Sequence, residues 1–172
     1  MNSTLVLTII SADRPGLVGQ LSAVIADHGG NWLESRMAHL GGHFAGILRV
    51  ELPAEQQAKL LASLRALESQ GLTVHTHSDS VVTTATPGQL VTVTVVGHDR
   101  PGIVRQISQV FAQLRVNVED FASHCESAPM SGETHFHATA TVQLPANCTV
   151  DQLRQALEAL ATDLMVDISV RQ

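Results

Sequence analysis

Basic residues are scarce in this sequence, which has 10 Lys and Arg residues against 16 Asp and Glu residues. The formal charge of -6 argues against a phosphate-binding surface, because proteins hold nucleic acids mainly through Lys and Arg. Cysteine is also rare: Cys125 and Cys148 are the only two, and both lie in the second half of the chain. We therefore expect two reduced thiols and no disulfide framework.

Long apolar runs are lacking as well. No stretch approaches the roughly 18 apolar residues that a bilayer-spanning helix needs. The sequence also does not begin with a basic stretch followed by an apolar run, the pattern of a secretion signal. We expect a soluble cytoplasmic protein that contacts neither membranes nor nucleic acid directly.

Motifs that carry catalysis are missing too. The sequence has no Walker loop, no nucleotide-binding glycine fingerprint and no nucleophile elbow. Cys125 follows His124, but adjacent residues of a strand point to opposite faces and cannot form a nucleophile pair. We expect no catalytic residues and no cofactor.

What the sequence does contain is one passage in two copies. DRPGLVGQLSAVIADHGGN at 13–31 recurs 86 residues later as DRPGIVRQISQVFAQLRVN at 99–117, with 10 of 19 positions identical. Such a repeat indicates two copies of one small module. The predicted bounds are 1–78 for the first module, 79–89 for a linker and 90–172 for the second module. Because modules of this size have thin cores, contact between them or a homodimer is expected.

Each module shows the pattern of a β-α-β-β-α-β unit. The first has predicted strands at 5–10, 32–40, 43–52 and 72–77, and helices that begin at Pro15 and Pro53 and end at Gly29 and Gly71. The second has predicted strands near 90–96, 118–126, 134–144 and 165–170, and helices near 101–114 and 149–161. The fold class is therefore α+β, with two tandem ferredoxin-like units, each an antiparallel four-stranded sheet with two helices on one face.

The repeated Asp-Arg-Pro-Gly sequence lies between the first strand and the first helix of each module. Backbone N–H groups at a helix N-terminus can bind a carboxylate, and Pro15 and Pro101 are expected to fix the helix start. Glycine would let a small ligand approach the backbone closely. The aspartate disfavours a phosphate but suits an ammonium group. We infer that the pattern suits a zwitterion, of which a free amino acid is the simplest.

Asn31 and Asn117 stand at the entry to the second strand of each module and add an amide that can donate to a carboxylate and accept from an ammonium. The alternative is that Asp-Arg-Pro-Gly is only a turn, in which the aspartate favours the positive end of the helix dipole and the asparagine closes the helix. Trp32 is expected to pack in the core, with a ligand-lining role as its alternative.

Nine histidines raise the question of a metal site. His75 with His77, and His135 with His137, are pairs that project from one face of a strand. Neither pair recurs in the other module, and no carboxylate or cysteine stands at typical ligand spacing beside them. We therefore expect no metal site.

Asp-Arg-Pro-Gly, followed by Gly-Gly-Asn in one copy and Val-Asn in the other, each within β-α-β-β-α-β, resembles the ACT domain. This module senses small molecules and is usually specific for amino acids. In the family, the ligand usually lies at the interface between two such domains, beside the loop after the first strand and the start of the second strand. The resemblance implies these ligand-binding residues: Asp13, Arg14, Pro15, Gly16 and Asn31 in the first module, and Asp99, Arg100, Pro101, Gly102 and Asn117 in the second.

A tandem pair with no enzyme attached, and with Ala-Pro-Met-Ser-Gly inserted in the second central hairpin, is similar to the glycine cleavage system transcriptional repressor group. Members of that group are regarded as accessory regulators that sense glycine. The resemblance implies a non-enzymatic regulator that binds a small amino acid, with glycine favoured, and acts through a DNA-binding transcriptional activator protein. The alternative is a scaffold that binds its partner irrespective of any metabolite. Since Gly29 and Gly30 are replaced by Arg115 and Val116, the two sites need not have equal affinity.

Overall fold

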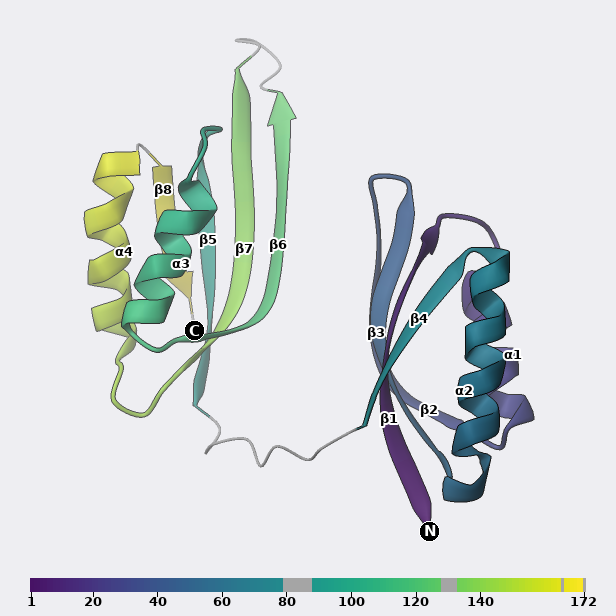
Figure 1. Cartoon of the computed structure of the whole chain (residues 1–172). Coiled ribbons are helices and arrows are strands. Elements are labelled where there is room, and N and C mark those ends of the chain that lie inside the picture. The colour runs from purple at the N-terminus through teal and green to yellow at the C-terminus, as the bar shows by residue number, and fades with distance from the viewer. Residues whose placement is uncertain (79–87, 128–132, 165, 172) are drawn as a thin grey trace. The chain divides into compact units, whose positions relative to one another are not determined.

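The chain forms two compact units, each with its own hydrophobic core. The structure, a computed structural model, describes residues 1–78, 88–127, 133–164 and 166–171. Both units have the predicted order of elements, β-α-β-β-α-β (Figure 1). The predicted linker at 79–89 and the predicted hairpin insertion at 127–132 lie largely outside the described residues.

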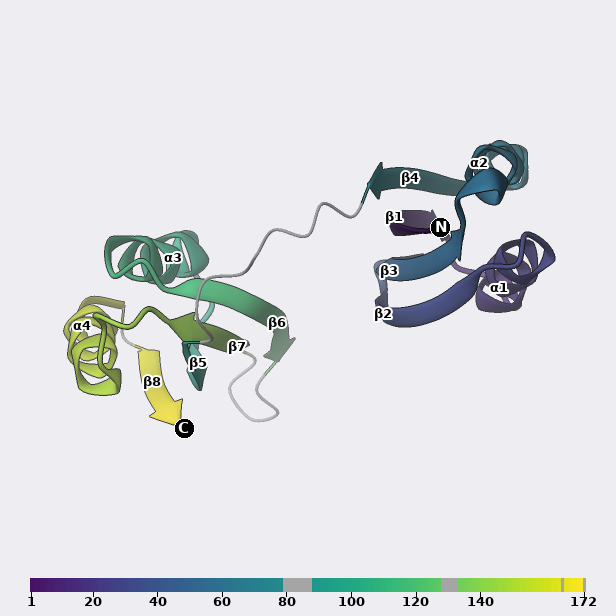
Figure 2. The same cartoon turned by 90° about the horizontal axis from the view of Figure 1, so that it is seen from below.

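The first module is a four-stranded sheet with helices on one face (Figure 2). Its strands are β1 (Asn2–Ala12), β2 (Asn31–Leu40), β3 (His43–Pro53) and β4 (Leu72–Ser78). They lie in the order β2-β3-β1-β4, and all neighbours are antiparallel. The helices are α1 (Leu17–Asp27) and α2 (Gln57–Ala66), and α2 is flanked by the 3-10 helices η1 (Ala54–Gln56) and η2 (Leu67–Gln70).

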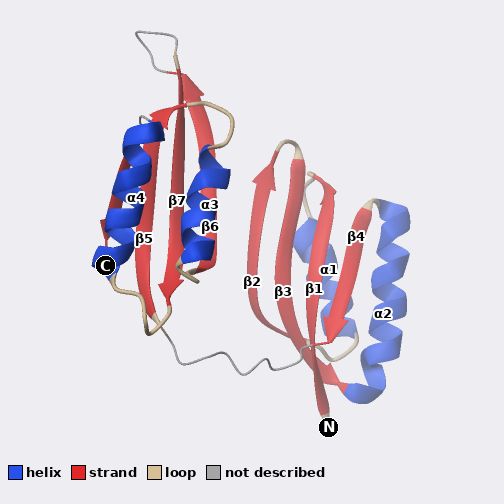
Figure 3. Ribbon diagram, turned by 60° about the vertical axis from the view of Figure 1, so that its left-hand side comes forward, coloured by secondary structure: helices blue, strands red, loops and turns tan. Residues whose placement is uncertain are grey.

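The second module repeats this architecture (Figure 3). Its strands are β5 (Gln89–His98), β6 (Asn117–Ser127), β7 (Thr134–Leu144) and β8 (Val166–Arg171), in the antiparallel order β6-β7-β5-β8. Its helices are α3 (Ile103–Gln113) and α4 (Val150–Leu164). Met165, the predicted start of the last strand, lies outside the described residues.

The cores follow the period-two pattern of the strands. Leu5, Leu7 and Ile9 of β1 are at most 2% exposed and face α1 and α2, which contribute apolar side chains such as Leu21 and Leu60. In β7 alternate residues are all buried under the helices: Phe136, Ala138, Ala140, Val142 and Leu144. Trp32 is half-buried against the first core, as the core prediction requires.

The helices α1 and α3 end alike, in Schellman motifs. Gly29 N–H donates to Ala26 O and Gly30 N–H to Ile25 O at the end of α1. At the end of α3, Arg115 N–H donates to Ala112 O and Val116 N–H to Phe111 O. The motif needs a left-handed residue, which is Gly29 (φ 68°) in the first module and Arg115 (φ 55°) in the second. The predicted end of α1 at Gly29 is thus confirmed.

Pro53 is the N-cap of the 3-10 helix η1, so the second helical segment of the first module begins one residue after it. It is the last residue of β3, with an extended backbone (φ -58°, ψ 132°), and η1 separates it from α2. Among the described residues, no helix combines the length and the apolarity that a membrane span requires.

Candidate functional site

The turn after the first strand has the same backbone geometry in both modules. Gly16 has φ 90° and ψ 0°, and Gly102 has φ 98° and ψ -3°, the conformation of the third residue of a type II turn. The helices therefore begin at Leu17 and Ile103, and the prediction that they begin at Pro15 and Pro101 is wrong. The reason is that proline followed by glycine favours a type II turn, in which the left-handed glycine interrupts the helix.

The first turn of each helix leaves its backbone donors open to a ligand. The first intrahelical hydrogen bonds run from Gln20 N–H to Gly16 O at 2.8 Å and from Gln106 N–H to Gly102 O at 3.0 Å. The amides before these donors have no intrahelical acceptor. The N-cap residues Gly16 and Gly102 have no side chain with which to cap these amides. A carboxylate placed there would meet N–H groups at the positive end of a helix dipole.

The turn aspartates contact the second strand of their module rather than the helix. Their backbone N–H groups are anchored at 2.9 Å, Asp13 to Gly42 O and Asp99 to Thr134 O. The Asp13 Oδ2 atom lies 3.6 Å from His39 Nε2 of β2. In the second module, desolvation and the charge of Asp99 raise the pKa of the Cys125 thiol of β6. The N-cap residues of the following helices are Gly16 and Gly102, which have no side chain to cap the helix, and the turn-only alternative stays open.

The Arg14 side chain connects the turn of the first module to the 3-10 helix η2, which follows α2. Its Nη2 atom donates to Gln20 Oε1 at 2.8 Å and to the Gln70 carbonyl at 3.3 Å. The Gln20 side chain donates in turn to that of Gln70. The guanidinium group therefore lies beside the first turn of α1, where it adds positive charge to the dipole of the helix.

The asparagines lie at the other end of the sheet. Ala12, which precedes the turn, pairs with His43, whereas Asn31 pairs with Glu51. His43 and Glu51 are eight positions apart along β3. At about 3.3 Å per residue, the turn and the asparagine are therefore about 26 Å apart along the sheet. In the second module Asn117 pairs with Gln143, eight residues along β7 from His135, the partner of His98.

Within a single module, the turn and the asparagine therefore do not converge on one small ligand, and their predicted role in ligand binding stays a prediction. Topology is the reason, because α1 and α3 carry the chain back along the full length of the sheet before the second strand begins. In addition, the Asn117 amide already donates to Glu119 Oε1 at 2.6 Å. A small amino acid can contact the turn or the asparagine of one module, but not both.

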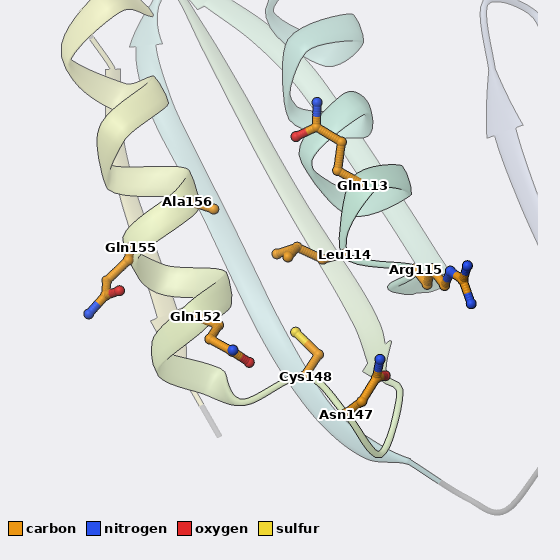
Figure 4. Close-up of a pocket in the computed structure, with 8 residues that line it drawn as sticks. All are labelled: Gln113, Leu114, Arg115, Asn147, Cys148, Gln152, Gln155 and Ala156. Carbon is orange, nitrogen blue, oxygen red and sulfur yellow. The ribbon is translucent and has the colours of Figure 1, made fainter.

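A pocket of about 550 Å³ adjoins the asparagine end of the second module. It lies between the end of α3 and the start of α4, and Figure 4 shows Leu114 and Cys148 extending between the two helices while Arg115 points away. Partial burial raises the pKa of the Cys148 thiol. No sequence motif predicts this pocket, because amide side chains make up much of its lining.

Carboxylates lie close to the histidines of the second module. Glu133 Oε2 lies 3.7 Å from His98 Nδ1, and the ring of His98 meets that of His135 edge to face, with centroids 5.0 Å apart. Glu126 Oε1 lies 3.0 Å from His137 Nε2. In the folded module, each of these contacts brings a carboxylate to the histidines, which their spacing in the sequence does not indicate. By contrast, His124 and Cys125 pair with His137 and Phe136 and so point to opposite faces of the sheet, as predicted.

Known proteins share both the sequence pattern and the fold. The family described as the ACT domain matches residues 3–77 and again residues 89–171. The glycine cleavage system transcriptional repressor of Escherichia coli (strain K12) is 27% identical over 169 residues, which cover 96% of this chain and 88% of that protein. The protein of the same name from Shigella flexneri has the same identity and coverage.

Two crystal structures span almost the whole chain. An unknown protein from Galdieria sulphuraria is similar with a TM-score of 0.87 and 30% identity, over 99% of this chain and 98% of that one. A second, provisionally described as a glycine cleavage system transcriptional repressor, has a TM-score of 0.73 and 23% identity, over 99% and 97% of the two chains. At that identity the second structure shows the fold alone.

Proposed function

Because the chain belongs to the ACT domain family in both of its modules, we propose that it is a non-enzymatic regulatory protein that senses a small amino acid. The observation that carries the proposal is the turn geometry common to the two modules. Gly16 and Gly102 adopt the same left-handed conformation and leave the first turn of the following helix without a side-chain cap.

The ligand's two charges match two features of the turn. Its carboxylate accepts hydrogen bonds from the first N–H groups of α1 or α3, where the helix dipole is positive. Its ammonium group is attracted by Asp13 or Asp99, whose carboxylates belong to the same turn. A Cβ at Gly16 would have no atom within 4 Å, so the backbone is open to close approach.

Glycine is the favoured ligand, and a protein is the favoured target. Both choices rest on the relative from Escherichia coli, whose name makes it a transcriptional repressor of the glycine cleavage system. The charge of -6 disfavours direct contact with DNA. We infer that the regulator acts on a DNA-binding transcriptional activator protein, and that the amino acid shifts it between states with different affinity for that partner.

Calorimetric titration of glycine, serine and alanine into dialysed full-length protein tests the proposal. Asp13→Asn and Asp99→Asn remove the charge at each turn while keeping the side-chain volume. Losing a charge-assisted contact should weaken glycine binding at the affected module by about tenfold. Asp27→Asn, at the opposite end of α1, is the matched control and should leave the affinity unchanged.

The asparagines are tested separately, because they lie at the other end of each sheet. If Asn31→Ala or Asn117→Ala abolishes binding while the aspartate variants bind normally, the amino acid binds at the asparagine end. Absence of binding for all three amino acids would overturn the sensor proposal. If the affinity for the partner protein is then the same with and without each amino acid, the scaffold alternative is supported.

A further inference from the structure

We propose that the second module binds a divalent transition-metal ion such as zinc through His98, Glu133 and His135. Among the described residues, these form the one group of three or more His, Cys, Asp or Glu side chains whose ligand atoms all lie within 4.8 Å of one another. The proposal does not depend on amino-acid sensing.

Strand pairing brings the three ligands together. His98 is the last residue of β5 and pairs directly with His135, the second residue of β7. Because Phe136 is buried under the helices, His135 and its partner project from the opposite, open face of the sheet. Glu133 immediately precedes β7, so its carboxylate reaches His98 at the same corner.

The ligand set suits zinc. Two imidazoles and one carboxylate are a known set of three protein ligands, which leaves a further position for water. At zinc–ligand distances of about 2 Å, two tetrahedral ligand atoms lie about 3.3 Å apart. The 3.7 Å between His98 Nδ1 and Glu133 Oε2 is close to that value. A magnesium ion fits less well, because it prefers oxygen ligands and octahedral geometry.

Further charged and aromatic groups surround the site on the same face. Glu126 of β6 pairs in register with His135 and contacts His137 at 3.0 Å. The rings of His124 and His137 are stacked 5.1 Å apart, with an angle of 8° between their planes. Glu126 thus adds negative charge to the face that carries His98 and His135, and negative charge favours a bound cation.

The first module provides an internal comparison. Ala12 pairs with His43 as His98 pairs with His135, and Gly41 stands where Glu133 stands. Two of the three ligands are therefore absent there. The first module instead has the exposed pair His75 and His77 of β4, which belongs to no such three-ligand group among the described residues.

Calorimetric titration of zinc chloride into untagged, chelator-treated full-length protein carrying Cys125→Ser and Cys148→Ser tests the site. The serine substitutions remove the thiols as competing ligands. We expect one zinc ion per chain, no comparable magnesium binding, and a loss of at least about tenfold in affinity for each of His98→Ala, Glu133→Gln and His135→Ala. The double variant His75→Ala/His77→Ala is the control and should bind zinc as its parent does.

Cobalt absorption gives a second readout, since cobalt bound by two imidazoles and a carboxylate shows visible bands that His98→Ala should abolish. Circular dichroism checks that each variant is folded. Glu133→Gln, at an exposed position, keeps the test valid if His135→Ala does not fold. Absence of zinc binding to the parent protein, or an affinity unchanged by all three ligand substitutions, would overturn the proposal.

Discussion

Cys125 stands in the second module where His39 stands in the first. Each is the eighth residue after its asparagine, Asn117 or Asn31, and each pairs with a phenylalanine of the central hairpin. The imidazole of His39 lies 3.6 Å from Asp13, whereas the thiol of Cys125 is under the electrostatic influence of Asp99. The two turns thus share a backbone but differ in the chemistry that holds their aspartate.

This difference predicts that the Cys125 thiol is alkylated slowly. Partial desolvation, the charge of Asp99 and the hydrogen bond to its carboxylate all raise the pKa of that thiol above its ordinary value. Since the thiolate is the nucleophile, less of it is present at a given pH and alkylation is retarded. Asp99→Asn removes the negative charge, so the pKa should fall and alkylation at pH 8 should accelerate.

The pH dependence of iodoacetamide labelling in the Cys148→Ser background measures this effect on a single thiol. The midpoint of the rate profile should move to lower pH in Asp99→Asn. Asp151→Asn, in the first turn of α4, serves as the control and should leave the midpoint in place. An equal midpoint in parent and Asp99→Asn would show that the carboxylate does not control the thiol.

Alanine substitutions at two glycines of the first module, Gly16 and Gly19, should change the stability of the protein in opposite directions. Gly16→Ala forces a Cβ into a left-handed backbone (φ 90°), which costs about 1–2 kcal/mol of stability. Gly19 lies in α1 with no atom within 4 Å of an added Cβ, so Gly19→Ala should stabilise the protein by up to about 1 kcal/mol. Denaturant unfolding measures both, and destabilisation by Gly19→Ala would contradict the helical assignment of that position.

Arg115 is expected to be a strained helix end. It adopts φ 55° at the position where α1 ends in Gly29, and a left-handed non-glycine residue costs roughly 1 kcal/mol. Arg115→Gly should therefore stabilise the protein, whereas Arg115→Ala removes the same charge but keeps the strain and should not. Thermal unfolding of the two variants separates the backbone effect from the loss of the side chain. A gain in Arg115→Ala equal to that in Arg115→Gly would refute the strain argument.

The sequence predicts the fold well because the repeat and the periodicity are local signals. The strand predicted at 134–144 is confirmed as β7, and its alternate residues from Phe136 to Leu144 lie in the core. The predicted helix starts at Pro15 and Pro101 are wrong because a proline is compatible with both a first helical turn and a type II turn. Only the left-handed backbone of Gly16 distinguishes them.

The candidate site was harder to predict, because it depends on strand pairing. Asn31 follows the turn by only fifteen residues in sequence, yet it lies at the far end of the sheet. Conversely, His98 and His135 are 37 residues apart but pair directly in the register of β5 and β7. Residue spacing alone reveals neither relationship, whereas the sheet order and register establish both.

The start of α4 gives a prediction that tests the second module alone. Thr149 and Gln152 form a capping box, in which Gln152 N–H donates to Thr149 Oγ1 at 3.2 Å and Thr149 N–H donates to Gln152 Oε1 at 2.8 Å. Thr149→Ala removes one of these acceptors and should cost about 1 kcal/mol, whereas Thr149→Ser retains it and should cost much less. Thr162→Ala, an exposed substitution within the same helix, is the matched control.

Denaturant unfolding followed by circular dichroism measures these three variants. Because alanine is the better helix former, Thr162→Ala should leave stability unchanged or raise it slightly. If Thr149→Ala and Thr149→Ser destabilise equally, the loss comes from the missing methyl group and not from the hydroxyl, and the capping box does not stabilise α4. A loss specific to Thr149→Ala instead assigns the start of the helix to the two reciprocal hydrogen bonds.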